Sequence, residues 1–174
     1  MKQAEPSPDS QDAVRPKRFH RRLLLVPLVL ILCLYAVSLF SWTRSTAGLV
    51  NGRLRPCPES PNCVCSQTSE PNVADSIHDI DPIRFEGDPA QAWSRLEAVL
   101  SGLPRVATTE RTGNYLRTEF TTPILRFVDD VEFLLDPANG VIHVRSCSRV
   151  GYGDLGTNRR RVEMIRDQFH SAVQ

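Results

Sequence analysis

The chain has 174 residues, with 21 Lys and Arg against 20 Asp and Glu, a formal net charge of +1 at pH 7. From Thr43 onward it holds 15 arginines, no lysine and 17 carboxylates, a formal charge of −2. This balance argues against a nucleic-acid partner, because phosphate binding requires a basic surface. Residues 55–174 suffice for one domain with its own hydrophobic core, and for no more.

The N-terminal part predicts a membrane anchor. Residues 1–22 are rich in Pro, Ser, Gln and charge and are expected to form a disordered cytosolic tail. Residues 23–42 contain no charged side chain, and as a helix they would span about 30 Å, the thickness of bilayer hydrocarbon. A cleaved signal peptide is the alternative, since Ser45, Thr46 and Ala47 offer a cleavage site, and a buried core helix is a second one.

The flanking charges predict the orientation of this helix. Basic residues crowd its N-terminal side, at Arg15, Lys17, Arg18, Arg21 and Arg22, and are sparser on the other side, at Arg44, Arg53 and Arg55. By the positive-inside rule the N-terminus stays in the cytosol. Residues 43–54 then form a linker, and residues 55–174 form an exported globular domain.

Four cysteines lie in the exported part, at positions 57, 63, 65 and 147, where disulfides persist. Four cysteines permit three pairings. A zinc site is the alternative, but the spacing lacks a paired C-x2-C and has no nearby histidine. Prolines surround the first cysteines, so this segment is expected to be an irregular loop, which a local bridge between Cys57 and Cys63 would fix.

The remaining pattern predicts an α+β fold. Residues 77–85 are short and extended, and Asp88 followed by Pro89 starts a helix that Gly102 ends. Two hairpins and a final helix follow, over 105–110 with 115–121, 125–135 with 141–149, and 158–172. We therefore expect an antiparallel sheet of four to five strands with two helices packed on one face, preceded by one transmembrane helix.

Alternation in the second hairpin predicts a charged face. Apolar residues occupy the odd positions from Leu125 to Leu135, interrupted by Asp129, and continue on the even positions Ile142 and Val144 of the next strand. Because burial of one face fixes the register, the opposite face should gather a set of charged residues. They are Asp130, Glu132, His143, Arg145 and Arg149.

The segment that follows carries a glycine motif and an arginine run. Residues 151–156 match G-x-G-x-x-G, but the chain lacks the further parallel strand of a dinucleotide-binding unit. Two alternatives remain: a glycine loop whose amides meet an anion at a helix start, or a flexible corner between strand and helix. Residues 159–161 are three arginines in the first helical turn, where the dipole disfavours cations. Either the carboxylates at 129, 130, 132 and 154 pair with them, or an anionic ligand does.

No catalytic motif accompanies these residues. The acidic run from Asp129 to Glu132 suits a divalent cation, but the nearby arginines make ion pairs the favoured interpretation. His78 and His143 lack a partner motif, so structural or surface roles are favoured over a general base. The sequence therefore predicts no catalytic residue, no metal and no cofactor.

Several motifs, taken in order, resemble the family known as domain of unknown function 1499. They are Cys57-Pro-Glu-Ser-Pro-Asn-Cys63-Val64, residues 127–132, residues 145–156 apart from positions 147 and 153, and Asn158-Arg159-x-Arg161. The likeness covers Arg55 to about Phe169 and implies an exported or membrane-attached bacterial protein without an established activity. The pattern also implies that Cys57 pairs with Cys63, and that the additional Cys65 and Cys147 pair with each other.

These observations lead to one hypothesis and two rivals. The first is a non-enzymatic module, tethered to the bacterial inner membrane and facing the periplasm, that binds a small anionic ligand or an envelope protein. The rivals are a hydrolase or transferase using Asp129 and Asp130 with Arg145 and Arg149, and a purely structural domain of a membrane assembly. The candidate binding residues are Asp129, Asp130, Glu132, Arg145, Arg149, Asp154, Asn158, Arg159 and Arg161.

Overall fold

The computed structural model describes residues 18–67 and 77–172 and separates into two units, residues 1–34 and 35–174. Helix α1 (Arg18–Thr43) begins in the first unit and ends in the second. Its stretch Leu25–Thr43 is long and apolar enough to cross a membrane, a test that a signal sequence also meets. Only 11% of this stretch is buried, unlike the core helix of a soluble protein. The predicted tail lies, up to residue 17, outside the described residues.

The second unit is built on an antiparallel sheet of six strands, one more than the upper predicted number. Its strand order is β3-β8-β7-β6-β5, and β4 pairs with β8 beside β3. The strands are β3 (Cys63–Cys65), β4 (Ile83–Arg84), β5 (Val106–Thr112), β6 (Tyr115–Thr121), β7 (Val128–Asp136) and β8 (Val141–Ser148). The sixth strand arises because the short segments β3 and β4 share β8 as their partner.

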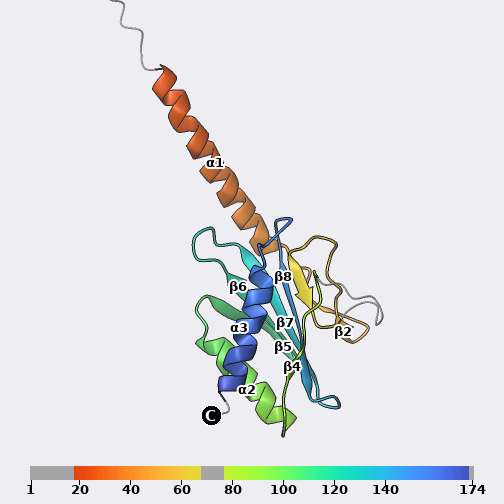
Figure 1. Cartoon of the computed structure of the whole chain (residues 1–174). Helices are drawn as coiled ribbons and strands as arrows, with labels where there is room; N and C mark the ends of the chain where they lie inside the picture. Colours follow the sequence, from red (N-terminus) through yellow and green to blue (C-terminus); the bar gives the residue numbers. More distant parts are fainter. Residues whose placement is uncertain (1–17, 68–76, 173–174) are drawn as a thin grey trace, which may run out of the picture. The chain divides into compact units, whose positions relative to one another are not determined.

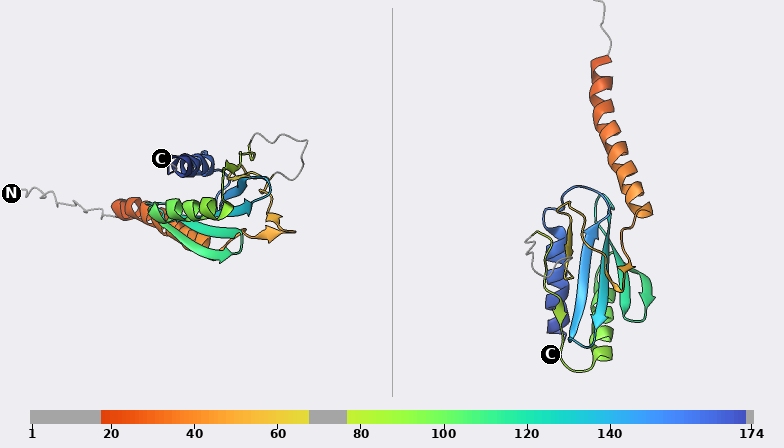
Figure 2. Two further views of the ribbon diagram at one scale, coloured as in Figure 1. Left: turned by 90° about the horizontal axis from the view of Figure 1, so that it is seen from below. Right: turned by 90° about the vertical axis from the view of Figure 1, so that its right-hand side faces the viewer.

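Two helices pack on one face of this sheet, as predicted (Figures 1 and 2). Helix α2 (Pro89–Gly102) begins at Asp88, whose carboxylate accepts hydrogen bonds from two backbone amides of the first turn. Helix α3 (Thr157–Ser171) follows β8. Leu96 of α2 and Ile165 of α3 are fully buried in one apolar core with Phe133 of β7. Burial of this face fixes the register of the central strands.

The other face of the sheet is also covered, which the sequence did not predict. The linker after α1 runs into a two-stranded sheet of β1 (Leu49–Val50) and β2 (Arg53–Leu54). Leu54 packs there against Tyr115 and Leu134 in a small second core. As a consequence, all but the last residue of β7 is buried. A strand with buried charges on its second face needs partners for each of them.

The register of β7 and β8 places the predicted charged residues together. Glu132 lies opposite Arg145, and Asp130 lies opposite Cys147, so their side chains share one face with His143. This alternation was read correctly from the sequence. That face is covered by the linker and the β1–β2 sheet, so most of its charged side chains are buried. Strand β7 also starts at Val128, and the segment from Leu125 to Phe127 belongs to the connection from β6.

Candidate functional site: a buried charge cluster

Three ion pairs join the charged motif residues to one another. Glu132 Oε2 lies 2.7 Å from Arg145 Nη1, and both side chains are 0% exposed. Asp130 Oδ1 lies 2.7 Å from Arg149 Nη2, and Asp129 Oδ2 lies 2.5 Å from Arg161 Nη2. A buried charge without a partner is strongly destabilising, whereas a paired one is tolerated. These six residues, here called the charge cluster, are therefore first of all mutually neutralising.

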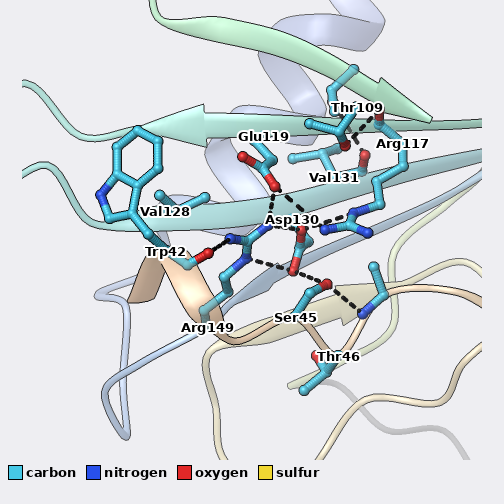
Figure 3. Close-up of polar contacts among 12 residues, drawn as sticks. Trp42, Ser45, Thr46, Thr109, Arg117, Glu119, Val128, Asp130, Val131 and Arg149 are labelled. Carbon is cyan, nitrogen blue, oxygen red and sulfur yellow. Dashed lines mark hydrogen bonds and ion pairs between the residues drawn. The ribbon is translucent and has the colours of Figure 1, made fainter. Parts of the chain in front are cut away.

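Arg149 is the most connected member of the charge cluster (Figure 3). Its Nε and Nη2 donate to the two carboxylate oxygens of Asp130 at 2.9 and 2.7 Å, and Nη2 also donates to Glu119 of β6. Its Nη1 donates to the backbone carbonyls of Ser41 and Trp42 at 3.1 and 3.4 Å. Burial works to lower the pKa of Arg149, but these hydrogen bonds to carboxylates outweigh it, and the pKa is raised.

The end of α1 and the linker supply further partners of the cluster. Ser45 Oγ donates to Asp130 Oδ2 at 2.8 Å, and the Gly48 amide donates to Glu132 Oε1 at 2.6 Å. Arg145 Nη2 donates to Thr46 Oγ1 at 3.3 Å, and the amide of Val128 donates to Ser41 Oγ at 3.2 Å. These bonds connect the end of α1 and the linker to the middle of the sheet.

Tyr115 completes the polar contacts around Glu132. Its hydroxyl donates to Glu132 Oε1 at 2.8 Å inside the domain. Burial and the neighbouring Glu132 carboxylate raise the pKa of Tyr115 far above its usual range. The phenol therefore stays neutral and acts as a hydrogen-bond donor. For Arg145, burial works to lower the pKa, but Cys147 and Glu132 raise it overall.

The third ion pair lies on the helix side of the sheet and is joined to an amide hub. Asn158 is fully buried at the start of α3. Its Oδ1 accepts from Ser146 Oγ at 2.6 Å and from Arg161 Nη1 at 2.5 Å. Its Nδ2 donates to Asn62 O at 2.8 Å and to Ser148 Oγ at 3.0 Å. The amide thereby connects β8, the segment before β3, and α3.

The two remaining candidates, Asp154 and Arg159, lie just before and just after the start of α3. Asp154 accepts from the amides of Gly156 and Asn158 at 2.9 and 2.6 Å, which satisfies donors at the helix start. Arg159 Nη2 donates to the Ile77 carbonyl at 3.1 Å. The arginine run therefore has separate partners, and Asp129 is the only one of the four predicted carboxylates that forms a described ion pair with it, through Arg161.

The predicted Cys57–Cys63 disulfide is present, with Cα atoms 5.6 Å apart. The predicted Cys65–Cys147 bridge was wrong, because both residues are free thiols. Strand β3 pairs with β8 so that Cys147 faces Cys63, while Cys65 faces Arg145. Cys65 and Cys147 are thus diagonal neighbours, with Cβ atoms about 7 Å apart, too far for a disulfide. Burial raises the pKa of both thiols.

A cleft of about 480 Å³ opens beside Arg149, between the last turns of α1 and the connection from β8 to α3. Arg44 and Arg149 line it with apolar residues such as Phe40 and Val150. The described residues around it include no Asp, Glu or His. Within 18–67 and 77–172, no group of three His, Cys, Asp or Glu side chains is placed to hold a metal ion.

The sequence reasoning missed the contributions of β6 and of the linker. Arg117 and Glu119 alternate with Tyr115 along β6, and the pairing with β7 brings them beside Glu132 and Asp130. This alternation is visible in the sequence and could have been used. The contacts of the helix end and linker have a weaker signal in the sequence. It consists of two serines, at positions 38 and 41, on one face of an otherwise apolar helix, and both serines are buried.

These features define the class of protein: a small α+β domain with a covered antiparallel sheet, a charge cluster between its strands, and an apolar helix in front. The chain belongs to the family described as protein of unknown function (DUF1499), whose model matches residues 53–169. The match includes all six residues of the charge cluster and begins after the linker residues that contact it. No curated protein matches the chain.

Proposed function

We propose that the chain is a single-pass inner-membrane protein with its N-terminus in the cytosol and its domain in the periplasm. The span Leu25–Thr43 and the excess of basic residues before it support this arrangement. The Cys57–Cys63 disulfide agrees with it, because such bonds persist in oxidising compartments. The span Leu25–Thr43 serves as the anchor, and the domain that follows it is the module that the anchor positions.

The module is non-enzymatic, and its charge cluster holds the domain to the end of its own membrane helix. The observation that carries this proposal is the set of bonds from Arg149, Asp130 and Glu132 to the backbone and side chains of residues 41–48. Each carboxylate of the cluster is bound by an arginine, and Asp130 and Glu132 accept further hydrogen bonds from the linker, so these groups hold the domain and linker together. General-base catalysis needs a base within reach of the substrate.

Trypsin cleavage after Arg44 tests the bond between linker and domain in the full chain. Replacing Ser45→Ala and Thr46→Val removes linker contacts and keeps every cluster charge. We expect this variant to be cut after Arg44 several-fold faster than the unmodified chain, with an unchanged near-UV circular dichroism spectrum. Arg111→Gln, in an exposed ion pair with Glu97, is the matched control and should be cut as slowly as the unmodified chain. Equal rates in all three proteins contradict the proposal.

Membrane insertion is tested separately. Alkaline carbonate should leave the chain in the membrane fraction, and protease added to spheroplasts should digest the domain while residues 1–22 stay protected. Recovery of a soluble product that begins after Ala47 would instead establish the signal-peptide alternative. A cleaved domain would keep the charge cluster but would lack Arg44, Ser45 and Thr46, so the trypsin experiment is carried out on the uncleaved chain.

A small anion or an envelope protein is the ligand class that we propose for this module. The cleft beside Arg149 favours an anion, because Arg44 lies at its rim, stacked 4.7 Å from the Phe40 ring. All three guanidinium nitrogens of Arg149 already donate hydrogen bonds to Asp130, Glu119 and the end of α1. Isothermal titration of the full chain with inorganic phosphate, compared with Arg44→Gln, tests this site. Identical binding by both proteins contradicts it.

A further inference from the structure

Three large apolar side chains are the most exposed among the described residues of the domain. Leu155 is 93% exposed, Ile124 86% and Tyr152 79%, and Leu125 beside Ile124 is 39% exposed. They sit on two connections, Thr122–Phe127 between β6 and β7, and Arg149–Gly156 between β8 and α3. Exposed apolar groups gathered in one place mark an interaction surface, whereas isolated ones do not.

Both connections lie at the end of the sheet that receives the last turn of α1 (Figures 1 and 2). Trp42 Nε1 donates to the Arg126 carbonyl of the first connection at 3.2 Å. Val150 of the second connection lines the same cleft as Val37. Val37 precedes Trp42 by five residues, about 7 Å along a helix axis, so this connection lies beside the apolar part of α1.

The second connection is built to display its leucine. Leu155 has φ 55°, a left-handed conformation that side-chain-bearing residues seldom adopt. Asp154 binds the amides of Gly156 and Asn158, and Arg160 Nη1 donates to the Leu155 carbonyl at 2.7 Å. These bonds fix the backbone on both sides of the tip. The exposure of Leu155 is therefore a property of an ordered loop.

Three arginines lie on or next to these connections. Arg105, Arg126 and Arg160 are exposed, and none of them forms an ion pair with a carboxylate of the described residues. Arg105 donates to the Thr121 carbonyl and Arg160 to Thr157 Oγ1, so both are held in place. Arg105 and Arg160 also line a cavity of about 400 Å³ with Leu103, Phe120 and Met164. Cations beside apolar groups match a bilayer surface with anionic headgroups.

We propose that this end of the domain docks onto the anionic lipid surface of the membrane that α1 crosses. Ile124, Leu125, Tyr152 and Leu155 enter the boundary between headgroups and acyl chains, while Arg105, Arg126 and Arg160 bind phosphate groups. The inference rests on the proposed membrane anchor and goes beyond it, because the anchor fixes only the end of α1 and does not by itself bring these connections into the lipid. The lipid is favoured over a protein partner because the tips flank the helix where it leaves the bilayer.

Depth measurement with nitroxide labels tests the docking in the full chain, reconstituted in nanodiscs that contain phosphatidylglycerol. Native Cys33 reports on α1, and Leu155→Cys or Ile124→Cys in a Cys33→Ser background reports on the tips. Ala138→Cys, in the hairpin at the opposite end of the sheet, is the matched control. We expect labels at 155 and 124 to collide with lipid-dissolved oxygen several-fold more, relative to a water-soluble nickel complex, than the label at 138.

The outcomes separate the two proposals. A lipid-buried label at Cys33 with a water-accessible label at 155 overturns the docking and leaves the anchor standing. A water-accessible label at Cys33 overturns the anchor itself. Spin–spin broadening between labels at 155 would assign the tips to a second copy of the chain and also overturn lipid docking. The label at 155 should lie deeper in phosphatidylglycerol than in phosphatidylcholine nanodiscs. Replacing Arg105, Arg126 and Arg160 by Gln should abolish this difference in depth, and an unchanged difference refutes the role of the arginines.

Discussion

Glu132→Gln offers the sharpest test of the charge cluster. The substitution keeps the shape of the side chain and removes the negative charge 2.7 Å from Arg145 Nη1. Arg145 is then left as a fully buried cation whose remaining described hydrogen bond goes to Thr46 Oγ1 at 3.3 Å. Breaking a buried pair by removing one partner costs about 3–5 kcal/mol. We expect the free energy of unfolding to fall by that amount.

The double variant Glu132→Gln with Arg145→Met separates charge pairing from packing. Replacing both members of a buried ion pair by groups of similar volume is often close to neutral. The double variant should therefore be more stable than Glu132→Gln alone, with a coupling between the two positions of at least about 2 kcal/mol. Urea unfolding of the full chain in detergent, followed by near-UV circular dichroism, measures all three proteins.

Two results would refute this reasoning. A single variant within about 1 kcal/mol of the unmodified chain would mean that water reaches Arg145, as for an exposed pair. Additive effects of the two substitutions would mean that Glu132 and Arg145 act on stability independently. Arg111→Gln, which interrupts the exposed pair with Glu97, is the control and should leave the urea midpoint unchanged.

Three further predictions follow from other residues. Non-reducing peptide mapping should find Cys65 and Cys147 as thiols, and a disulfide between them would refute the strand register. Iodoacetamide at pH 8 should modify both thiols only after unfolding, because burial raises their pKa. Burial lowers the pKa of His143 below its usual 6.5 despite the nearby Asp136. The unfolded chain therefore binds a proton more readily than the folded one, and stability is lost as the pH falls below about 6.5. The urea midpoint of His143→Gln should change less between pH 7.5 and 5.5 than the midpoint of the unmodified chain. Asp154→Ala removes two hydrogen bonds at the start of α3 and should lower stability by about 1 kcal/mol in the same urea assay, whereas no change would mean that water replaces the carboxylate.

The main features of the fold were accessible from local pattern. The Asp88-Pro89 start of α2 was confirmed because a side-chain cap and a first-turn proline act within one helical turn. The alternation in β7 and β8 was confirmed because a period of two fixes which residues share a face. The local Cys57–Cys63 bridge was confirmed. The failed bridge between Cys65 and Cys147 depended on a register between distant strands, which the spacing of cysteines does not contain.

The charge cluster shows where local pattern stops. The sequence indicated that Asp130, Glu132, Arg145 and Arg149 lie on one face, and this is what the register of β7 and β8 gives. Whether that face meets water, a ligand or more protein depends on a contact with residues 41–48, more than 80 positions earlier in the chain. Long-range contacts of this kind leave no periodicity, so the ligand-binding role of these residues stays a prediction.

The sequence by itself determined the apolar helix, helices α2 and α3, the two hairpins between them, the family, and the faces on which the charges of β7 and β8 lie, because each follows from neighbours along the chain. Only the tertiary structure decided how the charges are used. It buries the cluster under the linker, assigns each carboxylate its arginine, and keeps Cys65 and Cys147 apart. The physical reason is that burial, and with it the strength of an ion pair, depends on which distant segment covers the sheet.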